Sequence, residues 1–244
     1  MLIDLHAHSS GISKCCQIPG NEVVNEAKKV GLDGIVLTNH YKKNYVENNK
    51  WDDFAIKYVD EFNATKRYGE QIGIKVFFGI EVTMEKHSFV HLLIYGVDED
   101  FVLKNPCIFD LTQEELYKLV KKHNGILIQA HPFRGNKNNL LDLNYLDGIE
   151  INCHPLYEGT HINELISIAK KNNFIVTCGG DYHADTHRPK CGVYFKEVNS
   201  IEDIANELKK TKKIELCVQE KDQKSTFNFT YYRKNKIIGL PLKN

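Results

Sequence analysis

The chain has 244 residues, with 32 basic and 32 acidic side chains, 42% hydrophobic residues and seven cysteines. This composition predicts a folded α/β protein of one barrel-type domain or two small domains. The neutral charge balance gives no bulk attraction to nucleic acid or membranes, and no apolar run approaches the roughly 20 residues that span a bilayer. The cysteines lack C-x-x-C spacing, which argues against a zinc knuckle. We therefore expect a cytoplasmic protein with reduced thiols.

Strand-like and helix-like segments alternate along the first half of the chain. The apolar run at 2–5 predicts a first strand, followed by a helix at 21–30 and a second strand at 34–37. A longer helix is expected at 51–68, because Phe54, Tyr58 and Phe62 recur at helical spacing. The next two strands are expected at 76–82 and 90–95.

The second half continues the alternation. Thr112 to Glu115 reads as a capping box that starts a helix. Further strands are expected at 126–129, 148–151 and 174–178, with a helix at 161–172 between the last two. This order favours mostly parallel strands joined by crossover helices.

The C-terminal segment has a different pattern. A helix is expected to start at Ser200, followed by strands at 214–218 and 226–232. Phe227, Phe229 and Tyr231 alternate with polar residues, which is typical of an antiparallel or edge strand.

Residues whose side chains can bind a metal ion follow most of the apolar strands. They are His6, His8, His40, Glu81, His91, His131, Asp181 and His183. Each motif alone is weak, since polar residues at strand ends are commonly just solvated. That ordinary explanation accounts for one or two such residues, not eight. Imidazole and carboxylate are ligands for borderline divalent metals, so the set predicts one polynuclear metal centre at the carboxyl ends of the strands.

The spacing of these residues suits shared ions. His6 and His8 lie on the same side of a strand, because side chains alternate with period two, and Asp181 and His183 repeat the spacing. A carboxylate at Glu81 can bridge two cations. The set exceeds the ligands of one tetrahedral ion, so we expect two or three ions of Zn, Fe or Mn.

Other residues are candidates for contact with a substrate. Arg134 and Arg188 fall in loops near the predicted mouth, where a guanidinium suits a bidentate grip on phosphate. His154 and His187 also follow strand ends and are candidates for contacting substrate or metal. The remaining histidines, His87, His123 and His161, are expected to have no role in the site.

The ordered motifs resemble those of the polymerase-and-histidinol-phosphatase (PHP) family of metal-dependent phosphoesterases. The resemblance covers residues 1 to about 195 and rests on Asp4-Leu-His-Ala-His8, Thr38-Asn-His40, Gly79-Ile-Glu81, His91, Ala130-His-Pro132 and Gly180-Asp-Tyr-His183. It implies a distorted (β/α)7 barrel with the metal site at the C-terminal ends of the strands. We expect residues 1–244 to form a single domain, with 200–232 packed on its core.

The resemblance also implies a distribution of ligands. His6, His8, Glu81 and Asp181 would surround a first ion, Glu81 would bridge to a second held by His91 and His131, and His40 and His183 would hold a third. Relatives often supply another His or Asp shortly after the H-x-H motif. Here residues 9–16 contain neither, so either Cys15 or Cys16 is a thiolate ligand or the third site is weak or empty. Asn39 also replaces an Asp that is common in relatives.

The predicted function is hydrolysis of a small phosphate monoester by a metal-activated hydroxide, with Glu81, Asp181 and His183 as catalytic residues. The substrate could be a histidinol-phosphate-like compound, a nucleotide or a sugar phosphate. The absence of a basic stripe argues against a long nucleic-acid polymer. Three alternatives stay open: an oligonucleotide exonuclease of the same family, a metal-dependent amidohydrolase, and a metal-binding module without catalysis. The sequence leaves the oligomeric state open.

Overall fold

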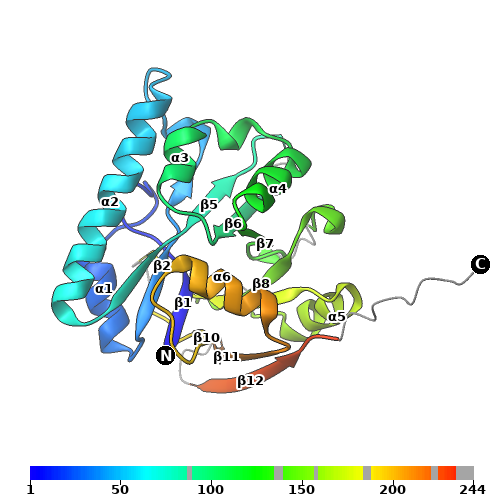
Figure 1. Ribbon diagram of the computed structural model, residues 1–244. Helices are drawn as coiled ribbons and strands as arrows, with labels where there is room; N and C mark the ends of the chain where they lie inside the picture. The colour runs from blue at the N-terminus through cyan, green and yellow to red at the C-terminus, as the bar shows by residue number, and fades with distance from the viewer. Residues whose placement is uncertain (87–89, 135–139, 157–158, 184–187, 221–224, 235–244) are drawn as a thin grey trace, which may run out of the picture.

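The computed structural model shows two mixed β-sheets with helices packed around them (Figure 1). It describes all residues except 87–89, 135–139, 157–158, 184–187, 221–224 and 235–244. The first sheet has the order β12-β11-β10-β1-β2-β4. Its strands are β1 (Leu2–Ala7), β2 (Gly34–Leu37), β4 (Lys75–Phe78), β10 (Gly192–Tyr194), β11 (Lys213–Gln219) and β12 (Thr226–Tyr232).

The second sheet has the order β3-β5-β6-β7-β8-β9. Its strands are β3 (His40–Tyr41), β5 (Ile80–Thr83), β6 (His91–Tyr95), β7 (Ile126–Gln129), β8 (Gly148–Asn152) and β9 (Ile175–Gly179). Among the described residues, antiparallel ladders are as numerous as parallel ones. The expectation of mostly parallel strands is therefore wrong, and a closed (β/α)7 barrel is not confirmed.

The two sheets meet at the metal-ligand motifs. Ala7, at the end of β1, forms an isolated parallel bridge with Tyr182, and the backbone N–H of Asp181 donates to His6 O at 2.8 Å. The first and last ligand motifs of the sequence thus lie side by side in space, which is why residues 175 positions apart can share one centre.

The strand predicted at 76–82 is two strands, β4 and β5, which break at Gly79 and belong to different sheets. A Cβ added at Gly79 would lie 2.5 Å from Val36 Cγ1 and 2.8 Å from Thr38 Cγ2. The chain can therefore pass this close to β2 only with glycine at that position. The break carries Glu81 out of the first sheet and into the second.

Six α-helices surround the sheets in the described residues. They are α1 (Gly20–Lys29), α2 (Trp51–Ile72), α3 (Asp100–Lys104), α4 (Gln113–Lys122), α5 (Ile162–Asn172) and α6 (Ile201–Lys210). Figure 1 shows α1 and α2 side by side at one flank, α5 at the opposite flank and α6 crossing in front of the strands. Single 3₁₀ turns lie at η1 (Lys43–Tyr45), η2 (Ile108–Asp110) and η4 (Leu143–Tyr145).

Several local predictions are confirmed. Phe54, Tyr58 and Phe62 form the buried face of α2. Capping boxes are present at the first turns of both α4 and α6, where a hydroxyl accepts from the N3 backbone and the N3 carboxylate accepts from the cap backbone. The last strand, β12, is antiparallel to β11 and lies at the sheet edge.

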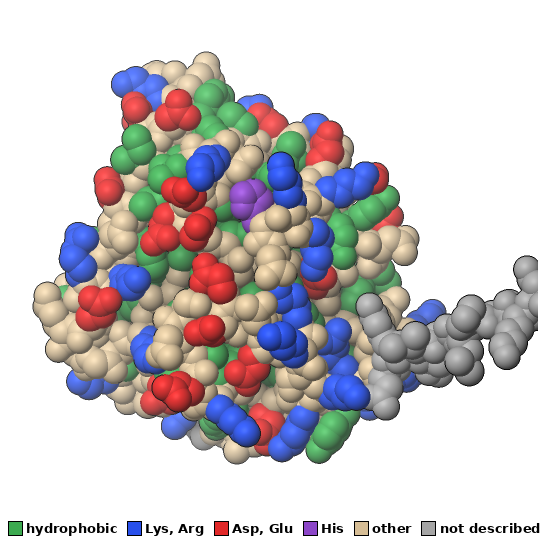
Figure 2. Space-filling model, viewed as in Figure 1, with side chains coloured by type: hydrophobic (Ala, Val, Ile, Leu, Met, Phe, Trp, Pro, Cys, Tyr) green, Lys and Arg blue, Asp and Glu red, His purple; other side chains and the backbone are tan. Residues whose placement is uncertain are grey.

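Charges on the visible surface are mixed in sign. On the face drawn in Figure 2, acidic and basic side chains are interspersed, and hydrophobic side chains are scattered between them. In the part of the chain that is described, no helix combines the length and apolarity needed to cross a bilayer.

Candidate metal centre

The Glu81 carboxylate lies at the centre of a buried histidine cluster. Five histidines place a ring nitrogen within 3.4 Å of it: His6, His8, His40, His91 and His131. Glu81 Oε1 is 2.8 Å from His91 Nδ1 and 3.1 Å from His131 Nε2, and Oε2 is 2.6 Å from His40 Nδ1. Burial alone would raise the pKa of Glu81, but the charges of His40 and His91 hold it well below its usual range.

His6 and His8 converge on Asp181, as the spacing predicts. The two histidines are fully buried, and their Nε2 atoms are 3.0 Å apart. His8 Nε2 is also 3.1 Å from Asp181 Oδ1, and His6 Nε2 is 3.4 Å from the same oxygen. Nitrogens and an oxygen directed at a common point are typical of a metal-binding geometry.

Some of the polar atoms around Glu81 have no hydrogen-bond partner among the described residues and would be satisfied by a divalent ion. His40 Nδ1 and Glu81 Oε2 are 2.6 Å apart, yet both are buried without a hydrogen-bond partner. Buried polar atoms in native proteins are nearly always satisfied. An ion bound between such atoms would satisfy both, and a set of imidazoles and carboxylates suits Zn, Fe or Mn.

Three groups of potential ligands overlap within the cluster. They are His6, His8 and Glu81; His40, Glu81 and His91; and His8, His40 and His183. Within each group the ligand atoms lie within 4.8 Å of one another. Because Glu81, His8 and His40 are each shared, the groups form one continuous centre rather than separate sites.

The third group lies beside Cys15. Desolvation alone would raise the pKa of this thiol, but hydrogen bonds from His183 and His40 lower it to about 5. Cys16 instead faces the backbone, 3.5 Å from His8 O and 3.6 Å from Ile18 O. Of the two cysteines that the sequence left open, only Cys15 lies beside the histidines of this group.

Glu150, which the sequence reasoning missed, orients the ring of His6 and holds the backbone of His131. Its Oε1 accepts a hydrogen bond from His6 Nδ1 at 2.8 Å, and its Oε2 accepts from the His131 backbone N–H at 3.0 Å. Fixing Nδ1 of His6 leaves Nε2 directed into the cluster. The signal was present, because Glu150 also follows an apolar start of a strand, but it is not part of a histidine motif.

A second missed network orients His8. Asn39 Oδ1 accepts from the Ser13 hydroxyl at 2.8 Å, and Ser13 Oγ lies 3.1 Å from His8 Nδ1 and accepts from the His40 backbone N–H. With its hydrogen donated to Asn39, Ser13 Oγ accepts from His8 Nδ1–H, so His8 Nε2 faces the cluster. Asn39 also bonds Ser9, since its Oδ1 accepts from the Ser9 backbone N–H and its Nδ2 donates to Ser9 Oγ. An amide suits this position because it both accepts and donates.

The position expected for Arg188 is wrong. Its side chain is fully buried, and Nη2 lies 2.7 Å from Asp4 Oδ2. Asp4 also accepts from the backbone N–H groups of His6 and Gly180. A fully buried guanidinium paired with Asp4 is not exposed to contact a substrate, and it ties β1 to the segment after Asp181.

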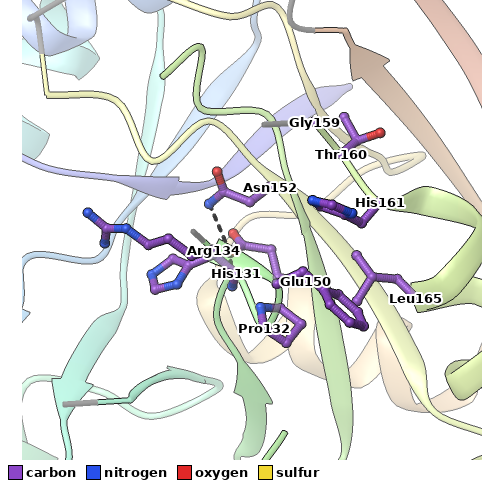
Figure 3. Close-up of a pocket in the computed structure, with 10 residues that line it drawn as sticks. His131, Pro132, Arg134, Glu150, Asn152, Gly159, Thr160, His161 and Leu165 are labelled. Carbon is purple, nitrogen blue, oxygen red and sulfur yellow. Dashed lines mark hydrogen bonds between the residues drawn. The ribbon is translucent and has the colours of Figure 1, made fainter. Parts of the chain in front are cut away.

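Arg134 and His154 lie near the histidine cluster. Arg134 is exposed and lines a pocket with His131, Asn152 and Thr160 (Figure 3), and also a neighbouring cavity of about 300 Å³. The His154 ring is buried, with its centroid 6.1 Å from that of His183.

The remaining histidines differ in position. His161 lines the pocket in Figure 3, although it is expected from the sequence to have no role. His123 is the C-cap of α4 and packs on Phe101, as a residue outside the site would. His87 and His187 lie outside the described residues.

Two ligand candidates adopt strained backbone conformations. His131 has φ of 28° and Asp181 has φ of 49°, in the left-handed region that side chains with a Cβ avoid. Such conformations cost about 1–3 kcal/mol each and concentrate at functional sites. The strain supports a requirement for these two side chains at fixed positions.

The PHP domain family matches residues 4–213 of this chain. The chain belongs to the PHP family. No curated protein sequence matches it significantly.

Solved structures with the same fold share little sequence with this chain. PsfC from Pseudomonas syringae PB-5123 superposes with a TM-score of 0.59 at 18% identity, over 85% of this chain and 86% of that one. A Chromobacterium violaceum amidohydrolase with bound sulfate superposes with a TM-score of 0.57 at 17% identity, over 86% of this chain and 96% of that one. A candidate metal-dependent phosphoesterase from Bifidobacterium adolescentis superposes with a TM-score of 0.52 at 18% identity, over 84% of this chain and 94% of that one. At such identities the likeness shows the fold alone.

The position of Cys15 leads to a test by substitution. Cys15→Ser should remove about one equivalent of metal, because a hydroxyl is a poor ligand for a soft or borderline ion, whereas Cys15→His should retain it. Cys16→Ser is the matched control and should keep full metal content. Elemental analysis of the three purified variants gives the result, and equal metal in Cys15→Ser and Cys16→Ser would show that Cys15 is not a ligand.

Proposed function

We propose that this protein is a metal-dependent phosphoesterase that hydrolyses a small phosphate monoester. The observation that carries the proposal is the buried Glu81 carboxylate shared among five imidazoles, with Asp181 beside two of them. Bound divalent ions would polarise phosphoryl oxygens and lower the pKa of a water molecule toward neutrality. Two to three ions of Zn, Fe or Mn are proposed, held by the ligand set described above.

The side chains around the proposed ions have separate roles. Glu81 and Asp181 supply the anionic charge that keeps two or more cations close together. His183 donates from Nδ1 to the Asp181 carbonyl at 2.8 Å, so its Nε2 is directed to His8 and His40 and suits a ligand.

His154 suits proton donation to the leaving oxygen better than His183 does. Its Nδ1 accepts the backbone N–H of Leu156 at 3.1 Å, so in the neutral ring Nε2 carries the hydrogen. The ring lies beside His183 at the edge of the cluster.

The surroundings of the centre favour a small anionic substrate. The cavity beside His91, His131 and Arg134 is about 300 Å³, at the lower end of the range for small-molecule sites. On the other flank, Lys42 Nζ lies 4.3 Å from the Tyr45 ring centroid and Lys14 Nζ lies 5.2 Å from it. The Tyr45 ring is 6.3 Å from that of His40, so cationic groups lie on two sides of the cluster.

An amidohydrolase is the second candidate, because one structure with this fold is named as one. Binuclear amidohydrolases often use a lysine as the bridging ligand, whereas Glu81 occupies the central position here. The shared carboxylate therefore favours the phosphoesterase. Amide substrates belong in the same assay panel as phosphate esters.

The proposed function is tested with metal-replete protein on phosphate monoesters, diesters and amides. We expect hydrolysis of an aryl phosphate monoester, loss of that activity after strong chelation, and recovery when Mn or Zn is restored. The chelated protein without added metal is the control. Turnover of amides but not esters would support the amidohydrolase, and turnover that survives removal of all metal would refute both.

Substrate binding is tested at Arg134. Arg134→Ala removes a charge-assisted contact worth about 1.5–3 kcal/mol, so kcat/KM for the monoester should fall about 10- to 100-fold with unchanged metal content. Arg67→Ala, which removes an exposed arginine near the end of α2, is the matched control. If both variants match the unmodified protein, the phosphate contact lies elsewhere, and Lys14→Ala and Lys42→Ala become the next variants to measure.

A further inference from the structure

Three buried cysteines form a second cluster of potential ligands outside the histidine centre. Cys153 follows β8, Cys178 lies on β9 and Cys191 precedes β10. Their exposed fractions are 5%, 0% and 0%. Their sulfur atoms all lie within 4.8 Å of one another, and the sulfurs of Cys153 and Cys178 are 3.6 Å apart.

The cluster lies on the opposite face of the β8–β9 strand pair from the histidine centre. Ile151 pairs with Cys178 in this parallel ladder, and Asn152 pairs with Gly179. Side chains alternate between faces, so Cys153 and Cys178 share one face and Glu150 and Gly179 share the other. A Cβ at Gly179 would meet His6 Cβ at 2.3 Å, which identifies that second face as the one toward the histidines.

The sulfur spacing fits a metal ion. Two sulfurs bound to one ion at about 2.3 Å lie about 3.8 Å apart in tetrahedral geometry and about 4.0 Å apart in trigonal geometry. The 3.6 Å separation of Cys153 and Cys178 is close to both values. A disulfide needs about 2.05 Å and joins only two of the three sulfurs.

We propose that Cys153, Cys178 and Cys191 form a thiolate site for a soft closed-shell cation such as Cu(I) or Zn(II). Thiolate ligands favour soft ions, so Cu(I) should prefer this site to the oxygen- and nitrogen-rich histidine centre, whereas Zn(II) fits both. Cys217 is a neighbour rather than a ligand, because its thiol lies 3.5 Å from Lys190 O and its carbonyl accepts from the Cys178 thiol.

An ion in this site would link two strand ends beside the histidine centre to the segment that precedes β10. Cys153 is adjacent to His154, Cys178 lies three residues before Asp181, and Cys191 lies three residues after Arg188. The proposed role is therefore to hold the ends of β8 and β9 in place. It does not depend on which reaction the histidine centre catalyses.

The test uses Cd(II) as the probe, because bound cadmium gives a thiolate charge-transfer absorption that imidazole and carboxylate ligands do not produce. The full-length protein is used reduced, metal-free and with Cys15→Ser and Cys16→Ser, so that neither thiol next to the histidines remains. We expect the absorption to saturate at one thiolate-bound cadmium per chain. Cadmium should also raise the thermal unfolding temperature, and this rise should be smaller in Cys178→Ala, which keeps the histidine centre.

Variants in this background identify the ligands. Cys178→Ala should abolish the thiolate absorption, whereas Cys217→Ala, which removes a buried thiol from the adjoining strand, should retain it. Cys153→Ser replaces Cys178→Ala if the latter fails to fold by circular dichroism. The proposal is wrong if reduced protein gives no thiolate absorption, if Cys217→Ala loses it equally, or if a Cys153–Cys178 disulfide forms in air while reduced protein binds no cadmium. Parallel titrations with Cu(I) and Zn(II) then show which ion binds more tightly.

Discussion

The burial of one carboxylate among five imidazoles is the interaction on which the centre depends. An ionised Glu81 without solvent would be costly alone, and several neutral or partly protonated histidines packed together would gain little from one another. Placed together, the carboxylate and the imidazoles offer a set of donor atoms that divalent ions would satisfy. The break at Gly79 makes this possible, because it moves Glu81 from the first sheet into the second.

A layer of contacts around the ligands fixes their orientation. Glu150 holds His6 by its Nδ1, Ser13 and Asn39 hold His8, and the buried Asp4–Arg188 pair connects β1 to the segment that carries Asp181. The contacts to His6 and His8 each direct the Nε2 atom of that ring inward. These residues determine where the nitrogen atoms of the ligand candidates lie.

The sequence predicted the ligand candidates because each follows an apolar strand, and most strands and helices were placed correctly by periodicity. It did not predict the two-sheet arrangement, since the break at Gly79 and the antiparallel pairing of β6 with β7 depend on contacts distant in sequence. It also misplaced Arg188, because a mouth arginine and a buried one look alike without the carboxylate of Asp4. The cysteine cluster was invisible for the same reason, as its members are separated by 25 and 13 positions.

The most direct test of this account is the metal content of Glu81→Gln compared with Glu150→Gln. Both variants neutralise a fully buried carboxylate, but only Glu81 contacts several histidines on the ligand side. The account predicts that Glu81→Gln loses more metal than Glu150→Gln, and more than any single-histidine variant, while circular dichroism shows an intact fold. Full metal occupancy in Glu81→Gln would contradict it.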